Sequence, residues 1–233
     1  MQVRLATRPG TPGWPNEDFA AVAPGAAVLL DGATTFPRNA ETGCVHGVAW
    51  YARVLGTTLL AAITAEPRIP LARALGEAIG DVRGRHEATC DLASPATPAA
   101  TVTAIRSSAD GIDYLALSDS SIAADPGDGL PPVVITDSHP PAGAVPAAAD
   151  KARAGTLPRA GLRGIALLSD GATRITDRYG LLSWPAALSV IREHGPDELI
   201  QQVRAAEDSD PDGIRWPRMK ASDDATIVYW RQD

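Results

Sequence analysis

Aspartates recur in this chain where short apolar segments begin or end. Two of them stand in nearly identical hexapeptides, residues 29–34 (LLDGAT) and 168–173 (LSDGAT), and each follows an apolar segment that predicts a strand. A strand fixes its carboxylate, and the following glycine allows a turn with positive φ that brings its own carbonyl toward whatever the aspartate binds. One Asp-Gly pair is usually a hairpin turn, but two near copies favour a shared chemical role.

Three further aspartates stand at the boundaries of other apolar segments. Asp119 follows one such segment, whereas Asp18 and Asp223 precede two others. In an antiparallel sheet the end of one strand lies beside the start of the next. We therefore expect these three to meet Asp31 and Asp170 on one rim of the fold.

Carboxylates gathered on one rim require a cation. Two charges about 4 Å apart repel by about 4 kcal/mol at an effective dielectric of 20. Carboxylate, carbonyl and water oxygens suit Mg²⁺ or Mn²⁺ rather than zinc or copper. Two such ions that share a carboxylate and a water would supply a hydroxide at neutral pH and hold a phosphoryl group. The alternative is that the aspartates only cap strands and turns.

Strands and helices alternate in the elements that must position these acids. Apolar runs and period-two patterns predict strands at residues 2–7, 19–22, 26–30, 101–106, 114–117, 133–136, 165–168 and 226–230. Apolar residues at three- to four-residue steps predict helices over 45–63 and 71–82, and Pro185 and Pro196 are placed to begin two more. This order predicts an α+β fold with helices on the outer faces of antiparallel sheets.

Size and charge limit the function classes. The 233 residues suffice for one domain, spanning residues 1–233, with a sizeable core. A net charge of −7 disfavours nucleic acid as the main partner. Apolar runs are shorter than a membrane helix needs and the first residues do not form a signal peptide, so we expect no membrane partner and a cytoplasmic protein. Residues 125–160, rich in Pro, Ala and Gly with one short strand, are interpreted as a flap or an exposed insertion.

Cysteines and most histidines carry no clear chemical pattern. Cys44 and Cys90 are the only cysteines, too few for a thiolate zinc site, although a disulfide between them stays open. His86, His139 and His194 lack metal-ligand spacing and are interpreted as core or surface residues.

The ordered set of motifs resembles the metal-dependent serine/threonine phosphatases of type 2C. The matching segments are residues 16–18, 28–32, 101–104, 115–120, 167–171 and 223–228. The resemblance implies a sandwich of two antiparallel sheets flanked by helix pairs. It also implies that phosphoserine or phosphothreonine in proteins is hydrolysed, without a phosphoenzyme, by a hydroxide bridging two Mn²⁺ or Mg²⁺ ions.

The resemblance further implies a role for each acid of the rim. Asp31 would bridge both ions and the Gly32 carbonyl would hold one of them. Asp170 and Asp223 would hold the other.

The remaining positions match the family less regularly. Glu17 and Asp18 would act near the second ion through water, and Asp119 matches a ligand of a third, weaker ion. Arg8 stands ten residues before Asp18, farther than the family's phosphate-gripping arginine, and is the candidate for that role. His46 is either the general acid for the leaving hydroxyl or a packed residue in the first turn of a helix.

Two alternative functions stay open. A catalytically silent relative would use the same rim to bind a partner such as a kinase, although Asp31, Asp170 and Asp223 are all present. An enzyme of the same fold would instead act on a small phosphoester.

Overall fold

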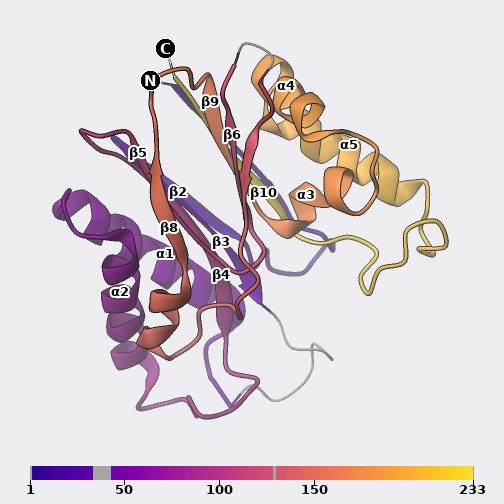
Figure 1. Ribbon diagram of the computed structural model, residues 1–233. Coiled ribbons are helices and arrows are strands. Elements are labelled where there is room, and N and C mark those ends of the chain that lie inside the picture. The colour runs from indigo at the N-terminus through magenta and orange to yellow at the C-terminus, as the bar shows by residue number, and fades with distance from the viewer. Residues whose placement is uncertain (1, 34–42, 128–129, 233) are drawn as a thin grey trace.

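Two antiparallel sheets pack face to face, with helices on both outer faces (Figure 1). The computed structural model describes residues 2–33, 43–127 and 130–232. In spatial order, sheet A consists of β1 (Gln2–Arg8), β10 (Ala225–Arg231), β9 (Gly164–Leu168), β6 (Ser121–Asp125) and β7 (Val133–Ile135). Sheet B consists of β2 (Phe19–Ala23), β3 (Ala26–Ala33), β4 (Ala99–Ser107), β5 (Ile112–Leu117) and β8 (Arg153–Leu157).

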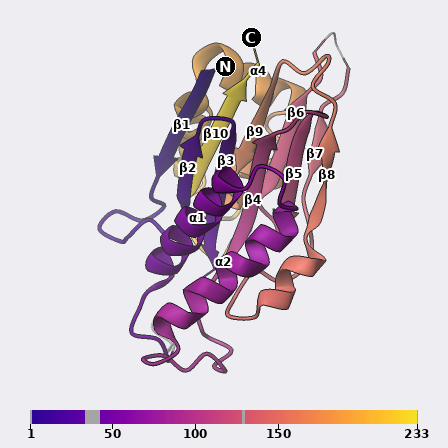
Figure 2. The same ribbon diagram turned by 90° about the vertical axis from the view of Figure 1, so that its left-hand side faces the viewer.

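The helices form two separate groups. In Figure 2, α1 (Val48–Ala65) and α2 (Leu71–His86) lie side by side across the outer face of sheet B. On the outer face of sheet A lie α3 (Asp170–Asp177), α4 (Trp184–His194) and α5 (Pro196–Asp208), and a 3₁₀ helix, η1 (Pro146–Lys151), contacts α2. This arrangement confirms the predicted α+β sandwich.

Strand β3 explains why continuous apolar runs mark the centre of this fold. Side chains alternate between the two faces of a strand. Leu29 points into the layer between the sheets, whereas Val28 and Leu30 belong to the cluster that packs against α1 and α2. Because both faces are covered, every residue from 26 to 30 is buried.

Helix α1 is the one helix in the described ranges that is long and apolar enough to cross a membrane by length and composition. Its Tyr51, Leu55 and Leu59 are buried in the cluster that includes sheet B and α2, while Arg53 and Thr57 are exposed. A single buried face opposite exposed polar residues is the pattern of a helix packed on a protein core.

The structure contains elements that the sequence patterns did not predict. Strand β6 is made mostly of small residues, and β8 is an edge strand that is largely exposed, so neither shows a strong apolar period. Residues 125–160, interpreted as a flap or an exposed insertion, contain the predicted strand as β7 and add the unpredicted edge strand β8 to the other sheet. Helix α3 begins at the Asp170-Gly171 pair, where the sequence predicted a turn.

Two glycines inside the paired helices give a matched test of this packing. A Cβ at Gly56 in α1 would lie 2.5 Å from Phe19 Cδ1 and 2.8 Å from Leu30 Cδ1, whereas one at Gly80 in α2 would meet nothing within 4 Å. Alanine gains about 1 kcal/mol over glycine inside a helix, but overpacking costs about 1–3 kcal/mol. We predict that Gly80→Ala raises the free energy of unfolding in urea by about 0.5–1 kcal/mol and that Gly56→Ala lowers it. Equal stabilisation by both substitutions would show that α1 does not approach sheet B this closely.

Candidate active site

One end of the sandwich carries a cleft of about 780 Å³ lined by acidic residues. Asp31 lies near the end of β3, Asp119 follows β5, Asp170 begins α3 directly after β9, and Asp223 precedes β10. Gly32 lines the same cleft. Strands that are neighbours or face each other across the sandwich thus bring together acids separated by up to 192 residues, from position 31 to position 223.

Asp31 sits at the centre of this group. Burial raises its pKa well above the usual range, and the carboxylates of Asp18, Asp170, Asp223 and Asp119 raise it further. Burial and the charge of Asp223 likewise raise the pKa of Asp170. The other four aspartates predicted to share the rim therefore all act electrostatically on Asp31, and each disfavours its ionised form.

Asp18 is buried behind the rim without a well-formed partner. Within the described ranges neither of its carboxylate oxygens makes a hydrogen bond of normal geometry. Burial raises its pKa to about 7, an effect that the nearby hydroxyls of Thr226 and Ser169 only partly offset. A buried carboxyl without a partner is costly. Its oxygens and the neighbouring acids are the hard ligands that a Mn²⁺ or Mg²⁺ ion uses, so the donor set fits such an ion.

The glycines after the two repeated aspartates serve close packing. The sequence reading expected a turn with positive φ at Gly32 and Gly171, but neither has one. Gly32 lies within β3, and a Cβ there would lie 2.7 Å from the Glu17 carbonyl oxygen and 2.5 Å from Val48 Cγ1. Gly171 lies in α3, and a Cβ there would overlap the Asp224 carbonyl oxygen. Both positions need glycine because backbone from another segment approaches too closely for a side chain.

Asp224 is a clamp rather than a member of the rim. Its carboxylate accepts hydrogen bonds of 2.7 Å from the backbone N–H of Gly10 and of 2.7 Å from that of Glu17, and its side chain is nearly buried. These bonds tie the loop between β1 and β2 to the start of β10. The clamp therefore fixes the backbone that presents Asp18.

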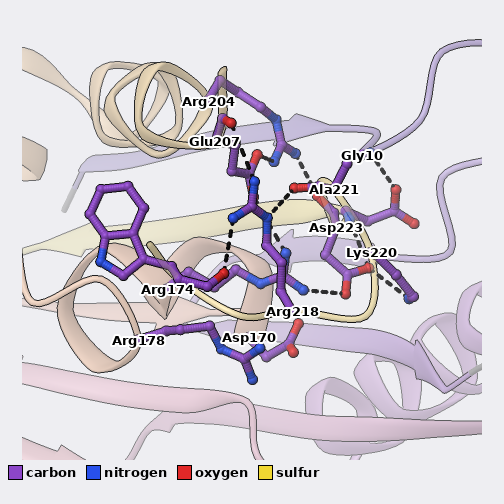
Figure 3. A network of polar contacts seen from close by, with 12 residues as sticks. Gly10, Asp170, Arg174, Arg178, Arg204, Glu207, Arg218, Lys220, Ala221 and Asp223 are labelled. Carbon is purple, nitrogen blue, oxygen red and sulfur yellow. Dashed lines mark hydrogen bonds and ion pairs between the residues drawn. The ribbon is translucent and has the colours of Figure 1, made fainter. Parts of the chain in front are cut away.

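Two cations hold Asp223 from both sides (Figure 3). Arg174 Nη2 lies 2.7 Å from Asp223 Oδ2, and Lys220 Nζ lies 2.9 Å from Oδ1. Arg174 also reaches the buried Glu207, 3.4 Å away. Arg174 was not predicted to have a role at this site. It stands four residues after Asp170, and this spacing, which places both on the same face of α3, was the available signal.

Arg178 lines the cleft and is exposed. Its Nη1 donates a long hydrogen bond of 3.5 Å to the Pro217 carbonyl, and no carboxylate of the described residues forms an ion pair with it. Arg218 lines the same wall, but Asp210 neutralises its guanidinium at 2.9 Å. The charge of Arg178 is therefore available to an anion in the cleft.

Two residues with predicted catalytic or binding roles lie elsewhere. Arg8 forms an exposed bidentate pair with Asp197, with two N–O distances of 3.0 Å. His46 lies beside Cys44 and Cys90 and stacks on Trp50 at a centroid distance of 4.0 Å. Neither residue lines the cleft, so a phosphate-gripping Arg8 and a general-acid His46 stay predictions without structural support.

Comparisons with known proteins place this site in a family. The family model for Protein phosphatase 2C matches residues 11–203. A search of curated protein sequences gave no significant match. The PPM Ser-Thr phosphatase MsPP from Mycobacterium smegmatis is 16% identical, with a TM-score of 0.66, and the alignment covers 100% of this chain and 99% of that one.

Two further solved structures share the fold. The serine/threonine phosphatase PstP/Ppp from Mycobacterium tuberculosis is 15% identical, covers 100% and 98% of the two chains and has a TM-score of 0.64. A catalytic domain of PstP solved with 2 manganese ions is also 15% identical, covers 99% and 97%, and has a TM-score of 0.61. The chain belongs to the protein phosphatase 2C family. It is a metal-dependent protein phosphatase that acts on phosphorylated substrates.

The raised pKa values predict how the stability of the metal-free protein depends on pH. Asp18, with a folded pKa of about 7 against 3.8 unfolded, and Asp31 and Asp170 all bind protons more tightly when folded. The stability that Asp18 contributes is therefore complete below pH 3.8 and is lost as pH rises through about 7, and Asp31 and Asp170 contribute in the same direction. In EDTA, the free energy of unfolding should fall between about pH 4 and pH 7 by an amount on the order of a few kcal/mol.

Asp31→Asn tests the source of this dependence. The substitution removes the carboxylate whose pKa the other four aspartates raise, so the unfolding free energy measured in urea should vary less with pH than in the wild type. Asp212→Asn, at an exposed acid outside the cleft, is the matched control and should leave the wild-type slope. If Asp31→Asn left the pH dependence of the unfolding free energy unchanged, that dependence would not arise from the aspartates of the rim.

Proposed function

We propose that this phosphatase hydrolyses phosphoserine and phosphothreonine in proteins with two Mn²⁺ or Mg²⁺ ions held at the acidic rim. The observation that carries the proposal is the convergence of Asp18, Asp31, Asp119, Asp170 and Asp223 at one end of the sandwich, with Asp18 buried and unpaired. Two manganese ions in the PstP catalytic domain support the choice and number of ions. The family match favours an enzyme over a silent binding module.

Different residues of the rim would hold each of the two ions. We propose that Asp31 contacts both, that the Gly32 carbonyl belongs to one, and that Asp170 and Asp223 belong to the other. Asp18 would complete the set through water. When bound, such ions lower the pKa of a water molecule and neutralise the phosphoryl oxygens during attack on phosphorus.

The protein supplies orientation and charge around this centre. Arg174 and Lys220 fix both oxygens of Asp223, so this carboxylate is held in place before any ligand binds. Arg178 offers a guanidinium to the phosphate, and such groups bind phosphate oxygens in a bidentate way. Because the rim is strongly acidic, a cation on the cleft wall also favours entry of an anionic substrate.

A phosphoprotein substrate implies a kinase that produces it. We propose that this chain works with such a partner kinase and that both act in the cytoplasm. The proposal of a protein substrate is supported by the cleft, which is open and lined by residues of the loop before β10, including Pro217 and Met219. Solution assays with a phosphopeptide and with a small phosphoester distinguish a protein substrate from a small molecule.

The metal requirement gives the first prediction for activity. Hydrolysis of a phosphothreonine peptide and of para-nitrophenyl phosphate should require Mn²⁺ or Mg²⁺ and vanish with EDTA. Asp31→Asn should lower kcat at least about 100-fold, since a metal centre contributes several kcal/mol to the barrier. The exposed control Asp212→Asn should keep wild-type turnover. Hydrolysis of neither substrate by the metal-loaded wild type would favour the silent module instead.

Arg178, the proposed phosphate-binding cation, gives the second prediction for activity. Arg178→Ala should lower kcat/KM for the phosphopeptide about tenfold, mainly through KM, because a charge-assisted hydrogen bond contributes about 1.5–3 kcal/mol and this one is exposed. Arg178→Lys should restore part of the loss. Arg8→Ala, at an arginine paired with Asp197, is the comparison and should change KM little. The reverse ranking would return the phosphate-gripping role to Arg8.

A further inference from the structure

A second group of potential metal ligands lies outside the acidic cleft. Cys44 and His46 come from the segment that leads into α1, and His86 and Cys90 come from the end of α2 and the turn after it. Their potential ligand atoms all lie within 4.8 Å of one another. None of the four lines the cleft.

The sulfur–nitrogen distances within this group match those of a tetrahedral zinc site, whereas the two sulfurs, 2.7 Å apart, would have to separate by about 1 Å to bind the ion. Cys44 Sγ lies 3.8 Å from His46 Nδ1 and 3.6 Å from His86 Nδ1, and Cys90 Sγ lies 3.5 Å from His46 Nδ1. Zinc bonds of about 2.3 Å to sulfur and 2.0–2.1 Å to nitrogen, arranged as a tetrahedron, separate sulfur from nitrogen by about 3.6 Å. The three sulfur–nitrogen distances therefore already have the spacing of zinc ligands.

Burial of His86 points to the same conclusion. The residue is only 1% exposed, and its Nε2 has no hydrogen-bond partner within the described ranges. Its Nδ1 lies 3.6 Å from the Cys44 sulfur, a weak partner for a buried imidazole. A metal bond to Nδ1 would replace this weak contact with a strong one and would leave the proton of the neutral ring on Nε2.

The group is also complete in charge and fixed in orientation. Two thiolates and two neutral imidazoles balance a divalent cation, so no net charge remains in this partly buried region. Trp50 stacks on His46, and its ring centroid lies 5.5 Å from that of His86. These contacts with Trp50 hold both imidazole rings in place. Four protein ligands leave no open position, which is the pattern of a structural rather than a catalytic zinc ion.

We propose that Cys44, His46, His86 and Cys90 bind one structural zinc ion. Sulfur and nitrogen ligands select zinc over the hard ions of the acidic cleft. Two cysteines alone are too few to predict such a site. The histidines that complete it stand in two segments about 40 residues apart, and only the fold brings these segments together. The assignment makes His46 a metal ligand in place of the general acid.

The position of the ion indicates its role. Helix α1 begins without a side-chain cap, and its first residue, Val48, packs against Gly32 of the acidic cleft. The ion would fasten the segment entering α1 to the end of α2, where the Gly43 carbonyl already accepts a 2.7 Å hydrogen bond from the Asp91 N–H. In Figure 2 the two helices lie antiparallel, so one ion joins the start of one to the end of the other. The site thus supports Gly32 through Val48.

Metal analysis of the full chain tests the proposal. Protein purified without chelator or added zinc should contain about one zinc ion per chain, by elemental mass spectrometry. Cys90→Ser and His86→Ala should each lower that content at least tenfold. His194→Ala is the control for loss of a histidine, and Asp31→Asn is the control for loss of the acidic site; both should keep the zinc.

Cobalt gives a readout that does not depend on the variants folding. Wild-type protein in which Co²⁺ replaces zinc should show the intense thiolate-to-cobalt absorption in the near ultraviolet and the visible bands of a tetrahedral site. The two sulfurs lie 2.7 Å apart, so a disulfide is the competing outcome. Zinc-free wild-type protein, with either two reactive thiols or a mass lower by two hydrogens, would overturn the proposal. That result would leave the phosphatase proposal intact, since its test is activity with Mn²⁺ or Mg²⁺.

Discussion

Repulsion among carboxylates is the constraint around which this structure is arranged. Asp31 is half-buried among four other aspartates, and packing holds them together against their charges. The aspartates can lie this close because two glycines allow close packing beside them. A side chain at Gly32 would overlap Glu17 and Val48, and one at Gly171 would overlap Asp224. The scaffold therefore accepts an unfavourable arrangement in the metal-free state, which is what a site poised for cations requires.

Two consecutive aspartates, Asp223 and Asp224, have different roles at this end of the sandwich. Asp223 faces the cleft between Arg174 and Lys220, whereas Asp224 points away and holds the loop before β2. The backbone turns sharply at Ser118, which has a left-handed conformation with φ of 70° directly before Asp119. Beside the start of α1, sulfur and nitrogen atoms form a group chemically distinct from the oxygen-rich rim. Donor type alone would direct different ions to the two places.

The sequence predicted what depends on local pattern and missed what depends on contact across the fold. Most strands and two helices follow from apolar patterns, two further helices follow from Pro185 and Pro196, and the rim follows from aspartates at strand boundaries. Strand β8 could not be recognised because an exposed edge needs no apolar period, and α3 could not because Asp-Gly also suits a turn. Arg174 and its partner Asp223 are 49 positions apart, and Cys44 and His86 are 42 positions apart. Spacing along the sequence does not predict contacts over such separations.

The order of strands in sheet A has a consequence for how the chain folds. Strand β10 is the last strand in the sequence, yet it lies between β1 and β9 and pairs with both. Until residue 231 has been synthesised, the inner edges of β1 and β9 have no partner, and the Asp224 clamp on Gly10 cannot form. Such long-range pairing is slow to establish and leaves strand edges exposed in the meantime. We therefore expect that the nascent chain completes sheet A only after synthesis, and that chaperones matter most for this half of the molecule.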